Sequence, residues 1–427
     1  MIDPLRSCGC KLTVLLAIAL CSASCHAYAV LTHEELIDLA WNDSIRPLLL
    51  ARFPAATDAQ LVEAHSYAYG GCAIQDMGYY PFGKVFFSNL THYVRSGDFV
   101  ARLLSDARTL NEYAFAIGAW SHYLGDSIGH SEAVNRATAL DFPKLKAKYG
   151  ESVTYGESPH SHIRTEFAFD VKELSDRAFA PSAYLERVGF RVPRKFLRDV
   201  FIETYGIDIA EVLGKARPDL KSYRTSVRSF IPAFAEAEVV LHKKQFLPPP
   251  DTEAYHVFAE RVARTNYQRR WRHTYKGPGF KAHLLAILVF IVPKIGAASD
   301  LAIKIPSHET EEWYLSSVNR TVDQFREILH DLLTESNTAI RFVNLDLDTG
   351  KRVKFGDYAL ADKAYAELLK RLTSKPRRGV SADLKRNLLD YYGDSLAVTD
   401  ANDPRTAQLE ALKAMGTRRG AESGSSE

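Results

Sequence analysis

Residues 114–130 read AFAIGAWSHYLGDSIGH, and this stretch decides how the rest of the chain is interpreted. Its first half consists of small and apolar residues, which is typical of a helix enclosed by other elements. His122, Asp126 and His130 then follow at intervals of four residues. At about 100° per residue, their side chains occupy an arc of about 80° on one helix face. The stretch therefore predicts a buried helix that turns two imidazoles and a carboxylate toward a common cavity.

Further acids and histidines lie on both sides of this helix. His162 and Glu166 repeat the four-residue spacing, and Asp76 and His92 lie upstream, sixteen residues apart. A lone histidine is more often a core or surface side chain than a ligand, and a single pair of this kind is commonly a surface interaction. Residues 122–166 instead contain three pairings of an acid with a histidine within 45 residues, and this density favours a multinuclear metal site. Zinc is the metal expected from such histidine and aspartate ligands in an exported protein.

The composition is that of a globular protein. Of its 427 residues, 46% are hydrophobic and 25% are charged, which excludes a disordered, collagen-like or coiled-coil chain. Lys and Arg number 54 against 52 Asp and Glu, so the formal net charge is +2. The strongly basic footprint of many nucleic-acid-binding proteins is therefore absent from the chain as a whole.

The first 27 residues have the pattern of a secretory signal peptide. Basic residues precede the apolar run LTVLLAIAL at 12–20, which is too short to span a bilayer. Small residues follow, and cleavage after either Ala27 or Ala29 satisfies the usual rule loosely. We therefore expect an exported protein that is periplasmic, located at the outer envelope or secreted.

Four of the five cysteines, including Cys21 and Cys25, lie in this leader. A lipoprotein anchored at either of these two is a weaker alternative, because neither follows a good lipobox. Removal of the leader leaves only Cys72, interpreted as a small buried hydrophobe, and excludes an intramolecular disulfide. An exported chain of about 400 residues without disulfides must be held together by core burial, by metal, or by both.

The spacing of apolar residues predicts a mainly α protein with one small β-hairpin. Helical patterns fill most of the chain up to a proline-rich break, LPPP at 247–250. We expect a multi-helix catalytic domain over 28–246, a helical accessory region over 251–415 and a disordered polar tail over 416–427.

The expected accessory region has no catalytic motif but several recognisable segments. Residues 252–273 predict an amphipathic, basic helix, and 284–292 (LLAILVFIV) form an apolar run too short to cross a membrane. A buried core helix is the simpler interpretation of this run. An interfacial membrane contact, which the basic stretch before it favours, is the alternative. Residues 342–355 predict the hairpin, and helices are expected near 358–373 and 380–392.

Taken in order, the acids and histidines resemble the zinc-dependent phospholipase C family, which is related to the fungal zinc-dependent single-strand nucleases. Both groups are mostly α-helical and hold a trinuclear zinc cluster at the bottom of a cleft. Their pattern is an N-terminal amine, an early His, a separated Asp and His, then H-x-x-x-D, a further His and H-x-x-x-E. The resemblance covers about 28–170. The matching residues are His33, Asp76, His92, His122, Asp126, His130, His162 and Glu166.

The resemblance implies which residues would hold each of three metals. The first would be held by Asp76, His92, His122 and Asp126. The second would be held by His130, His162 and Glu166. The third would be held by His33, the bridging Asp126 and the N-terminal amine and carbonyl of the mature chain.

The identity of the first mature residue follows from the same resemblance. In the nucleases an aromatic first residue ligates zinc, and the His follows five residues later. Cleavage after Ala27 makes Tyr28 the first residue and places His33 at that spacing. Tyr28 is therefore expected as a ligand, although Trp is usual at this position.

Two further departures from the family pattern bear on the second metal. The gap of four residues from Asp126 to His130 is shorter than in the secreted bacterial phospholipases. His130 could therefore lie closer to the first metal or join a different one. His160 could replace His162, but its gap of six residues to Glu166 fits one helix face less well.

The resemblance implies an exported, zinc-dependent phosphodiester hydrolase, and a phospholipase C is the main expectation. The alternatives are a single-strand-specific nuclease or 3′-nucleotidase, and a non-enzymatic zinc-binding envelope protein. Asp76 would act as base or orient the attacking water, as carboxylates in the family do.

The expected partner is a phospholipid substrate or a membrane surface, with nucleic acid only under the alternative and no protein partner evident. Tyr79, Tyr80 and Phe82 lie close in sequence to Asp76. They are candidates for a lipid or choline pocket, or for stacking on a base, and could equally belong to the core.

Overall fold

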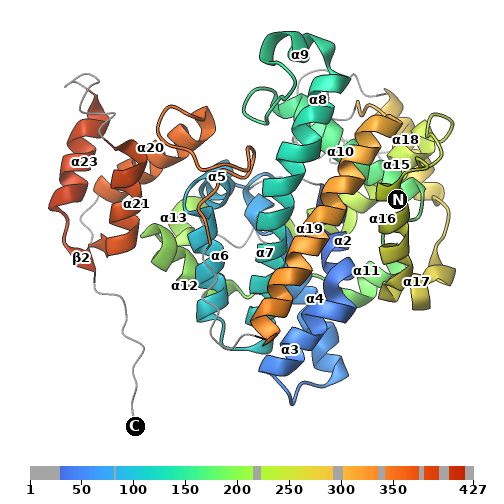
Figure 1. Cartoon of the computed structure of the whole chain (residues 1–427), viewed down its shortest axis with the longest axis horizontal. Coiled ribbons are helices and arrows are strands. Elements are labelled where there is room, and N and C mark those ends of the chain that lie inside the picture. The colour runs from blue at the N-terminus through green and yellow to red at the C-terminus, as the bar shows by residue number, and fades with distance from the viewer. Residues whose placement is uncertain are drawn as a thin grey trace, which may run out of the picture.

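The computed structural model describes residues 29–80, 83–214, 223–291, 302–334, 342–374, 379–393 and 403–418. The predicted fold class is confirmed, because helices make up most of this described part. The expected leader, together with Tyr28 and Phe82, lies outside the described residues, as does most of the expected tail. Figure 1 shows two long helices, α7 (Leu110–Gly129) and α19 (His308–Thr334), near the middle of the molecule.

Helix α7 is the most enclosed element of the described chain. It begins with a capping box, in which the Thr109 side chain accepts from the backbone N–H of Glu112 and the Glu112 side chain binds back. Every residue from Tyr113 to Gly129 is buried. The small and apolar residues before His122 predicted this, because a helix that is apolar on all sides must be enclosed.

Helix α4 (Asp58–Cys72) packs closely against α7 because glycines lie at their contact. A Cβ atom on Gly71 would lie 2.0 Å from a backbone oxygen of α7, and one on Gly118 would lie 2.1 Å from a backbone oxygen of α4. A larger residue at either place would therefore push the helices apart. This approach brings the end of α4 to the histidine face of α7, where Nδ1 of His122 lies 2.8 Å from the Cys72 carbonyl oxygen.

The other helices of the N-terminal half surround this pair. They are α2 (Val30–Ala40), α3 (Arg46–Arg52), α5 (Val85–Tyr93), α6 (Ser96–Asp106), α8 (Asn135–Asp141), α9 (Pro143–Tyr149), α10 (Pro159–Ser175), α11 (Ser182–Val188), α12 (Arg194–Tyr205), α13 (Ile209–Leu213) and α15 (Ile231–His242). Short π- or 3₁₀-helical turns are η1 (Trp41–Ile45), η2 (Gln75–Gly78), η3 (His130–Val134) and η4 (Ser226–Phe230). The predicted metal ligands within the described residues lie on α2, η2, α5, α7, η3 and α10.

The C-terminal half wraps around these elements. It contains α16 (Glu253–Arg264), α17 (Asn266–Arg270), η5 (Arg272–Thr274), α18 (Phe280–Ile291), α20 (Ala359–Thr373), α21 (Ala382–Tyr392), α23 (Pro404–Ala414) and a parallel pair of short strands, β1 (Val380–Ser381) and β2 (Thr417–Arg418). Figure 1 places α16 to α18 at one end of the molecule and α20 to α23 at the other, with α19 between them. Because α19 packs along α7, the residues of the expected accessory region directly contact the helices of the expected catalytic domain.

The helix predicted over 252–273 is divided in the structure. Helix α16 ends at Arg264, because Thr265 has extended backbone and its side chain caps the start of α17. The helices predicted near 358–373 and 380–392 are present as α20 and α21.

The hairpin predicted over 342–355 is reduced to a single antiparallel bridge between Asp346 and Lys351. Its first arm pairs with a helix instead of with a second strand. The backbone N–H of Leu345 donates to Oγ of Ser96 at 3.1 Å, and the same hydroxyl donates to the Leu345 carbonyl at 2.6 Å. The turn is therefore fixed by the N-terminal half of the molecule.

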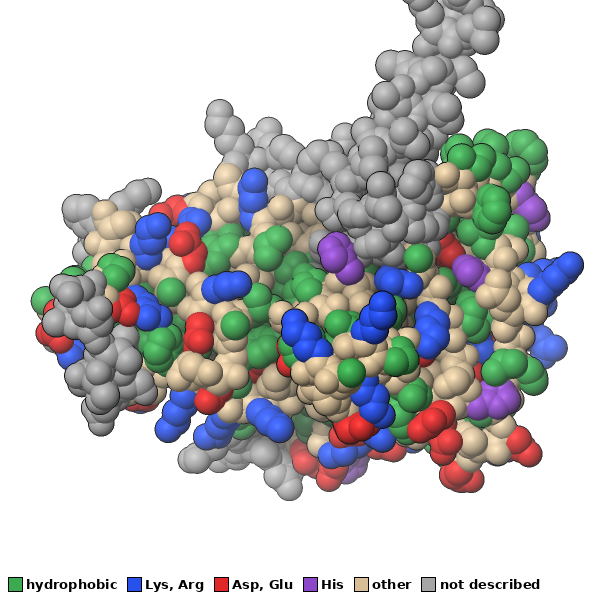
Figure 2. Space-filling view, turned by 90° about the horizontal axis from the view of Figure 1, so that it is seen from above, with side chains coloured by type: hydrophobic (Ala, Val, Ile, Leu, Met, Phe, Trp, Pro, Cys, Tyr) green, Lys and Arg blue, Asp and Glu red, His purple; other side chains and the backbone are tan. Residues whose placement is uncertain are grey.

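The apolar run 284–292 forms most of helix α18, up to Ile291. One face, with Ala282, Ala286 and Val289, is buried, and the helix packs against α15. The opposite face is exposed, so the interpretation as a buried core helix is wrong for that face. Figure 2 shows hydrophobic side chains gathered at the end of the molecule where Figure 1 places α18. Among the described residues, no helix combines the length and apolar character that crossing a bilayer would require.

Candidate metal centre

Asp126 is the central residue of the candidate site and is fully buried on α7. Its Oδ2 atom lies 2.9 Å from Nε2 of His122 and 3.2 Å from Nε2 of His92. Its other oxygen, Oδ1, lies 3.2 Å from Nε2 of His33. The two oxygens therefore have different histidine neighbours, which is the arrangement expected of a carboxylate that bridges two ions.

Asp76 completes a buried group of four with His92, His122 and Asp126. Its Oδ1 atom lies 3.3 Å from Nε2 of His92 and 3.8 Å from Nε2 of His122, and the two Nε2 atoms are 3.5 Å apart. With bonds of about 2.1 Å, the ligand atoms of a tetrahedral zinc ion lie about 3.4 Å from one another. The five separations that involve a histidine of this group, from 2.9 to 3.8 Å, scatter around that value. The group has the size and the ligand types of a zinc site.

His130, His162 and Glu166 form a second buried group. Oε1 of Glu166 lies 2.8 Å from Nε2 of His162 and 3.4 Å from Nε2 of His130. Helix α7 passes into the π-helical turn η3 at His130, which faces α10 and not the group around Asp126. His160 is exposed and does not take the place of His162.

The four histidines of the two groups are all oriented in the same way, through Nδ1. The carbonyl oxygens opposite Nδ1 are those of Ser88 for His92, Cys72 for His122, Leu347 for His130 and Val153 for His162, at 2.8, 2.8, 2.9 and 3.4 Å. A neutral imidazole that donates its Nδ1 proton to a carbonyl presents the lone pair of Nε2 on its other side. The backbone therefore selects the tautomer that metal ligation requires.

Several buried atoms of these groups have no hydrogen-bond partner among the described residues. They are Oδ1 of Asp76, both carboxylate oxygens of Asp126, and Nε2 of His130 and of His162. Leaving a buried polar atom unpaired costs about 1–3 kcal/mol. Cations held between these atoms would satisfy them, so the residues present fit the predicted metal ions.

The electrostatics of the two groups differ. Burial alone would lower the pKa of His92, but the carboxylates of Asp126 and Asp76, at 3.2 and 3.3 Å from its Nε2, raise it to about 10. A pair of carboxylates that favours a proton this strongly also attracts a divalent cation. In the second group, burial and the neighbouring His130 lower the pKa of His162 well below its ordinary value. His162 is thereby kept neutral, as a metal ligand must be.

A loop from the C-terminal half, which the sequence did not reveal, reaches both groups. The backbone N–H of Leu347 donates to the carbonyl oxygen of His92 at 3.2 Å, and the Leu347 carbonyl accepts from Nδ1 of His130. Asp348 is buried beside it, with Oδ1 3.5 Å from Nδ1 of His130. Its Oδ2 accepts hydrogen bonds from the hydroxyls of Tyr93 and Tyr358. We call these two residues the 347–348 clamp, because they hold one histidine of each group.

The first turn of α2 is fixed by Asp170, which lies one turn beyond Glu166 on α10. Its carboxylate accepts from the backbone N–H groups of Leu31 and Thr32 at 2.9 and 3.1 Å, and from the Thr32 hydroxyl at 2.6 Å. These bonds satisfy free N–H groups at the helix start and hold His33 in place beside the centre. Tyr28 lies outside the described residues, so its role as a ligand stays a prediction.

Two tyrosines border the centre. Tyr79 is 2% exposed, and its ring centroid lies 5.5 Å from that of His92 and 6.1 Å from that of Tyr155. The Tyr155 ring in turn lies 5.9 Å from that of His162. The sequence singled out Tyr79 but not Tyr155, which is distant along the chain. Tyr80 packs in the hydrophobic core, and its assignment as a substrate contact stays a prediction.

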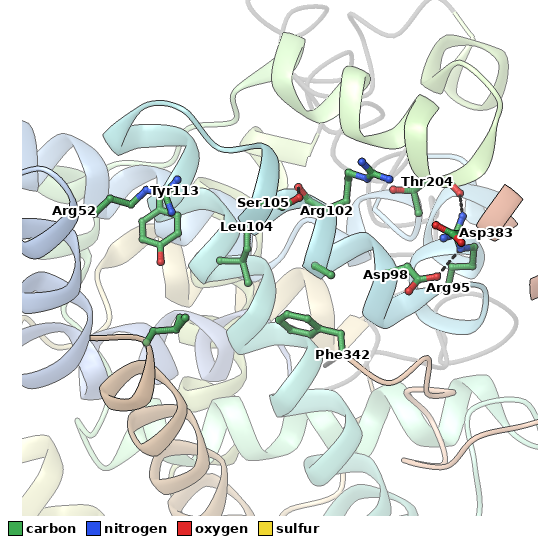
Figure 3. Close-up of a pocket in the computed structure, with 12 residues that line it drawn as sticks. Arg52, Arg95, Asp98, Arg102, Leu104, Ser105, Tyr113, Thr204, Phe342 and Asp383 are labelled. Carbon is green, nitrogen blue, oxygen red and sulfur yellow. Dashed lines mark hydrogen bonds and ion pairs between the residues drawn. The ribbon is translucent and has the colours of Figure 1, made fainter. Parts of the chain in front are cut away.

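A surface pocket of about 490 Å³ lies apart from the centre. Figure 3 shows Arg52, Arg95 and Arg102 among the residues that line it. All three guanidinium groups are engaged: Arg95 binds Asp98 at 2.6 Å, Arg52 donates to a backbone carbonyl at 2.9 Å, and Arg102 pairs with Asp106 at 3.9 Å. None of the predicted metal ligands lines this pocket, and we assign it no role in the site.

The fold and the site define a helical protein with a buried metal centre of histidines and carboxylates. Residues 32–214 match the family model described as zinc dependent phospholipase C. No curated protein and no solved structure matched the chain. The matched segment, which contains the predicted ligands from His33 to Glu166, belongs to the zinc dependent phospholipase C family. The protein is therefore a zinc phospholipase-type hydrolase, with zinc as its cofactor. The 347–348 clamp lies outside the matched segment.

Proposed function

We propose that the protein is an exported phosphodiester hydrolase that acts as a phospholipase C with up to three zinc ions. The observation that carries the proposal is the position of Asp126 between His33 on one side and His92 and His122 on the other. A second group of ligands combines His130, at the end of the same helix, with His162 and Glu166 of α10. When bound in such a cluster, zinc ions make water nucleophilic near neutral pH and neutralise the charge that builds on phosphate oxygens.

The proposed reaction needs no nucleophile from the protein. Water attacks phosphorus in line with the diacylglycerol oxygen, the bond between phosphorus and that oxygen breaks, and the oxygen leaves with a proton. Asp76 is assigned the role of orienting the water and receiving its proton, because its carboxylate faces two histidines of the first group. Cys72 takes no part, since burial raises the pKa of its thiol well above the ordinary value.

Tyr79 and Tyr155 support a substrate whose head group can bind against aromatic rings. Their rings lie between His92 of the first group and His162 of the second. A quaternary ammonium group is attracted to the faces of such rings. We therefore propose phosphatidylcholine as the first substrate to assay, with the choline group against these tyrosines.

The runner-up is a single-strand-specific nuclease or 3′-nucleotidase. The same two tyrosines could stack on bases, which supports this reading. The formal net charge of +2 gives it less support, because nucleic-acid affinity depends largely on cations that neutralise backbone phosphates. A non-enzymatic zinc-binding envelope protein is the third candidate.

One experiment separates the three candidates. The mature, zinc-loaded protein is incubated with phosphatidylcholine in mixed micelles and, separately, with single-stranded DNA, and its zinc content is measured by mass spectrometry. Release of phosphocholine with more than one zinc per chain is the expected result. Release of mononucleotides alone would replace the phospholipase by the nuclease. Less than one zinc per chain would reject the multinuclear centre, and N-terminal sequencing of the exported protein would show whether Tyr28 is its first residue.

A further inference from the structure

Helix α18 presents an apolar face to solvent. Nine large hydrophobic residues of the described chain are exposed, and five of them lie on this one helix. They are Phe280, Leu284, Ile287, Phe290 and Ile291, with 82, 49, 55, 77 and 69% exposed. At about 100° per residue they share an arc of about 120°. Single exposed apolar residues are common, but a continuous stripe of this kind marks an interaction surface.

The opposite face of α18 packs toward the helices that carry the second group of metal ligands. Ala282, Ala286 and Val289 are buried, and α18 packs against α15. Helix α15 packs in turn against α10, which carries His162 and Glu166. The exposed stripe is therefore held one helix layer away from the second group of metal ligands.

The segment of the chain that leads into α18 is strongly basic. Residues 261–291 contain seven Lys and Arg and no Asp or Glu. Two of these cations pair with acids elsewhere, Arg261 with Asp323 and Arg264 with Glu260. The remaining five are exposed and form no ion pair within the part of the chain that the structure describes. They are Arg269, Arg270, Arg272, Lys276 and Lys281.

We propose that α18 docks the protein on the surface of an anionic phospholipid membrane. The apolar stripe enters the boundary between head groups and acyl chains, and the five cations contact lipid phosphates. At 1.5 Å per residue, the 12 residues of α18 extend about 18 Å, whereas the hydrocarbon core is about 30 Å thick, so the helix lies in the membrane plane. The choice of lipid as the occupant rests on the proposed function.

A second copy of the chain fits the stripe less well. A strip about 18 Å long and about 10 Å wide offers roughly 200 Å², whereas a stable interface needs about 800 Å² from each partner. A symmetric pairing would also bring two sets of unpaired cations together. A membrane requires neither a large matching area nor acidic side chains on a partner.

The test is flotation of the zinc-loaded protein with vesicles of phosphatidylcholine alone or with 30% phosphatidylglycerol. The stripe variant carries Phe280→Ser, Phe290→Ser and Ile291→Ser, which are the most exposed of the five. The control variant carries Leu247→Ser and Leu333→Ser, which are exposed apolar residues elsewhere on the surface. Because all five substituted side chains are solvent-exposed, both variants are expected to fold, and thermal unfolding checks this.

We expect wild type to bind the anionic vesicles and the stripe variant to bind them at least 100-fold less, at roughly tenfold for each large side chain removed from water. The control variant should bind as wild type does. Replacing Arg269, Arg270 and Arg272 with Ala should weaken binding to anionic vesicles but not to phosphatidylcholine alone. Equal binding of wild type and the stripe variant would overturn the proposal, as would a dimer of wild type that the stripe variant does not form.

Assays with two substrates distinguish a failure of the docking surface from a failure of the proposed reaction. A soluble phosphocholine ester should be hydrolysed equally by wild type and the stripe variant, whereas vesicle lipid should be hydrolysed only by wild type. Vesicle binding without hydrolysis of either substrate would remove the proposed reaction and leave the docking surface. Hydrolysis of both substrates by the stripe variant at the wild-type rate would remove the docking surface and leave the reaction.

Discussion

The carboxylate of Asp348 is expected to set the zinc affinity of the second ligand group. The substitution Asp348→Asn preserves the shape of the side chain but removes a negative charge 3.5 Å from Nδ1 of His130. Outer partners of ligating histidines typically contribute about 10–100-fold to metal affinity, or about 1.4–2.7 kcal/mol. Asp348 is fully buried, so water screens little of this interaction. We expect D348N to lose one zinc 10–100-fold more readily than wild type, while the zinc held by the group around Asp126 stays at its wild-type affinity.

The assay is competition for zinc with a chromophoric chelator, followed by metal analysis of the protein that remains. The matched control is Asp357→Asn, an exposed acid of the same segment that accepts from the backbone N–H of Lys354 at 2.8 Å. D357N should titrate as wild type does. Y358F, which removes one of the two hydroxyls bound to Asp348, should lie between the two. A D348N protein that folds and keeps every zinc within twofold of wild type would refute the idea that the charge of Asp348 supports His130 as a ligand.

Three further changes test the ligand set, the helix anchor and the core. H162A should reduce hydrolysis by at least roughly 100-fold and lower the zinc content, whereas H160A, at an exposed position on the same helix, should leave phosphocholine release unchanged. Burial raises the pKa of Asp170 from 3.8 to about 7, so the folded protein keeps a proton that the unfolded chain has lost. Wild type should therefore lose thermal stability relative to D170N as the pH rises from about 4 to about 7 and not above, and a constant difference between the zinc-loaded proteins would contradict this. G118A should lose about 1–3 kcal/mol in urea unfolding, because its Cβ would lie 2.1 Å from a backbone oxygen of α4, whereas G277A, with nothing within 4 Å, should change little.

The part of the site that could be predicted from sequence is the part that lies on single helices. His122 with Asp126, and His162 with Glu166, are four residues apart, and that spacing alone places each pair on one face. His33, Asp76 and His92 have no such local relation to the rest, and only their order in a family pattern joined them. The structure brings all of them to within a few ångströms of Asp126 or of its histidine neighbours.

Contacts between distant segments could not be predicted in the same way. Asp170 and Leu31 are 139 residues apart in sequence, and His130 and Leu347 are 217 apart. In both contacts one of the two partners is a backbone group, which every residue possesses. Composition and spacing therefore do not predict these contacts.

The fold shows the same division between local and distant information. Helical periodicity predicted α20 and α21, because each has an apolar face that repeats every three to four residues. The run at 284–292 was harder, since periodicity does not say which of its faces another element covers. The predicted hairpin is reduced to one bridge for a related reason, because Leu345 of its first arm forms hydrogen bonds with Ser96 of α6.

Asp170 and the 347–348 clamp, which are not themselves predicted ligands, position the ligands from opposite ends of the chain. Asp170 holds the first turn of α2, so a chain cut after Ala27 would start one residue before the described segment and close to His33. The 347–348 clamp, in contrast, belongs to the C-terminal half and reaches His92 and His130 only after that half has folded back. A mature chain with Cys72 as its only cysteine has no disulfide to hold these segments, so bound ions would be the links between them. If the leader is removed as the sequence predicts, the centre would be complete only after that cleavage and after the whole chain has folded, and the proposed hydrolase would stay inactive until then.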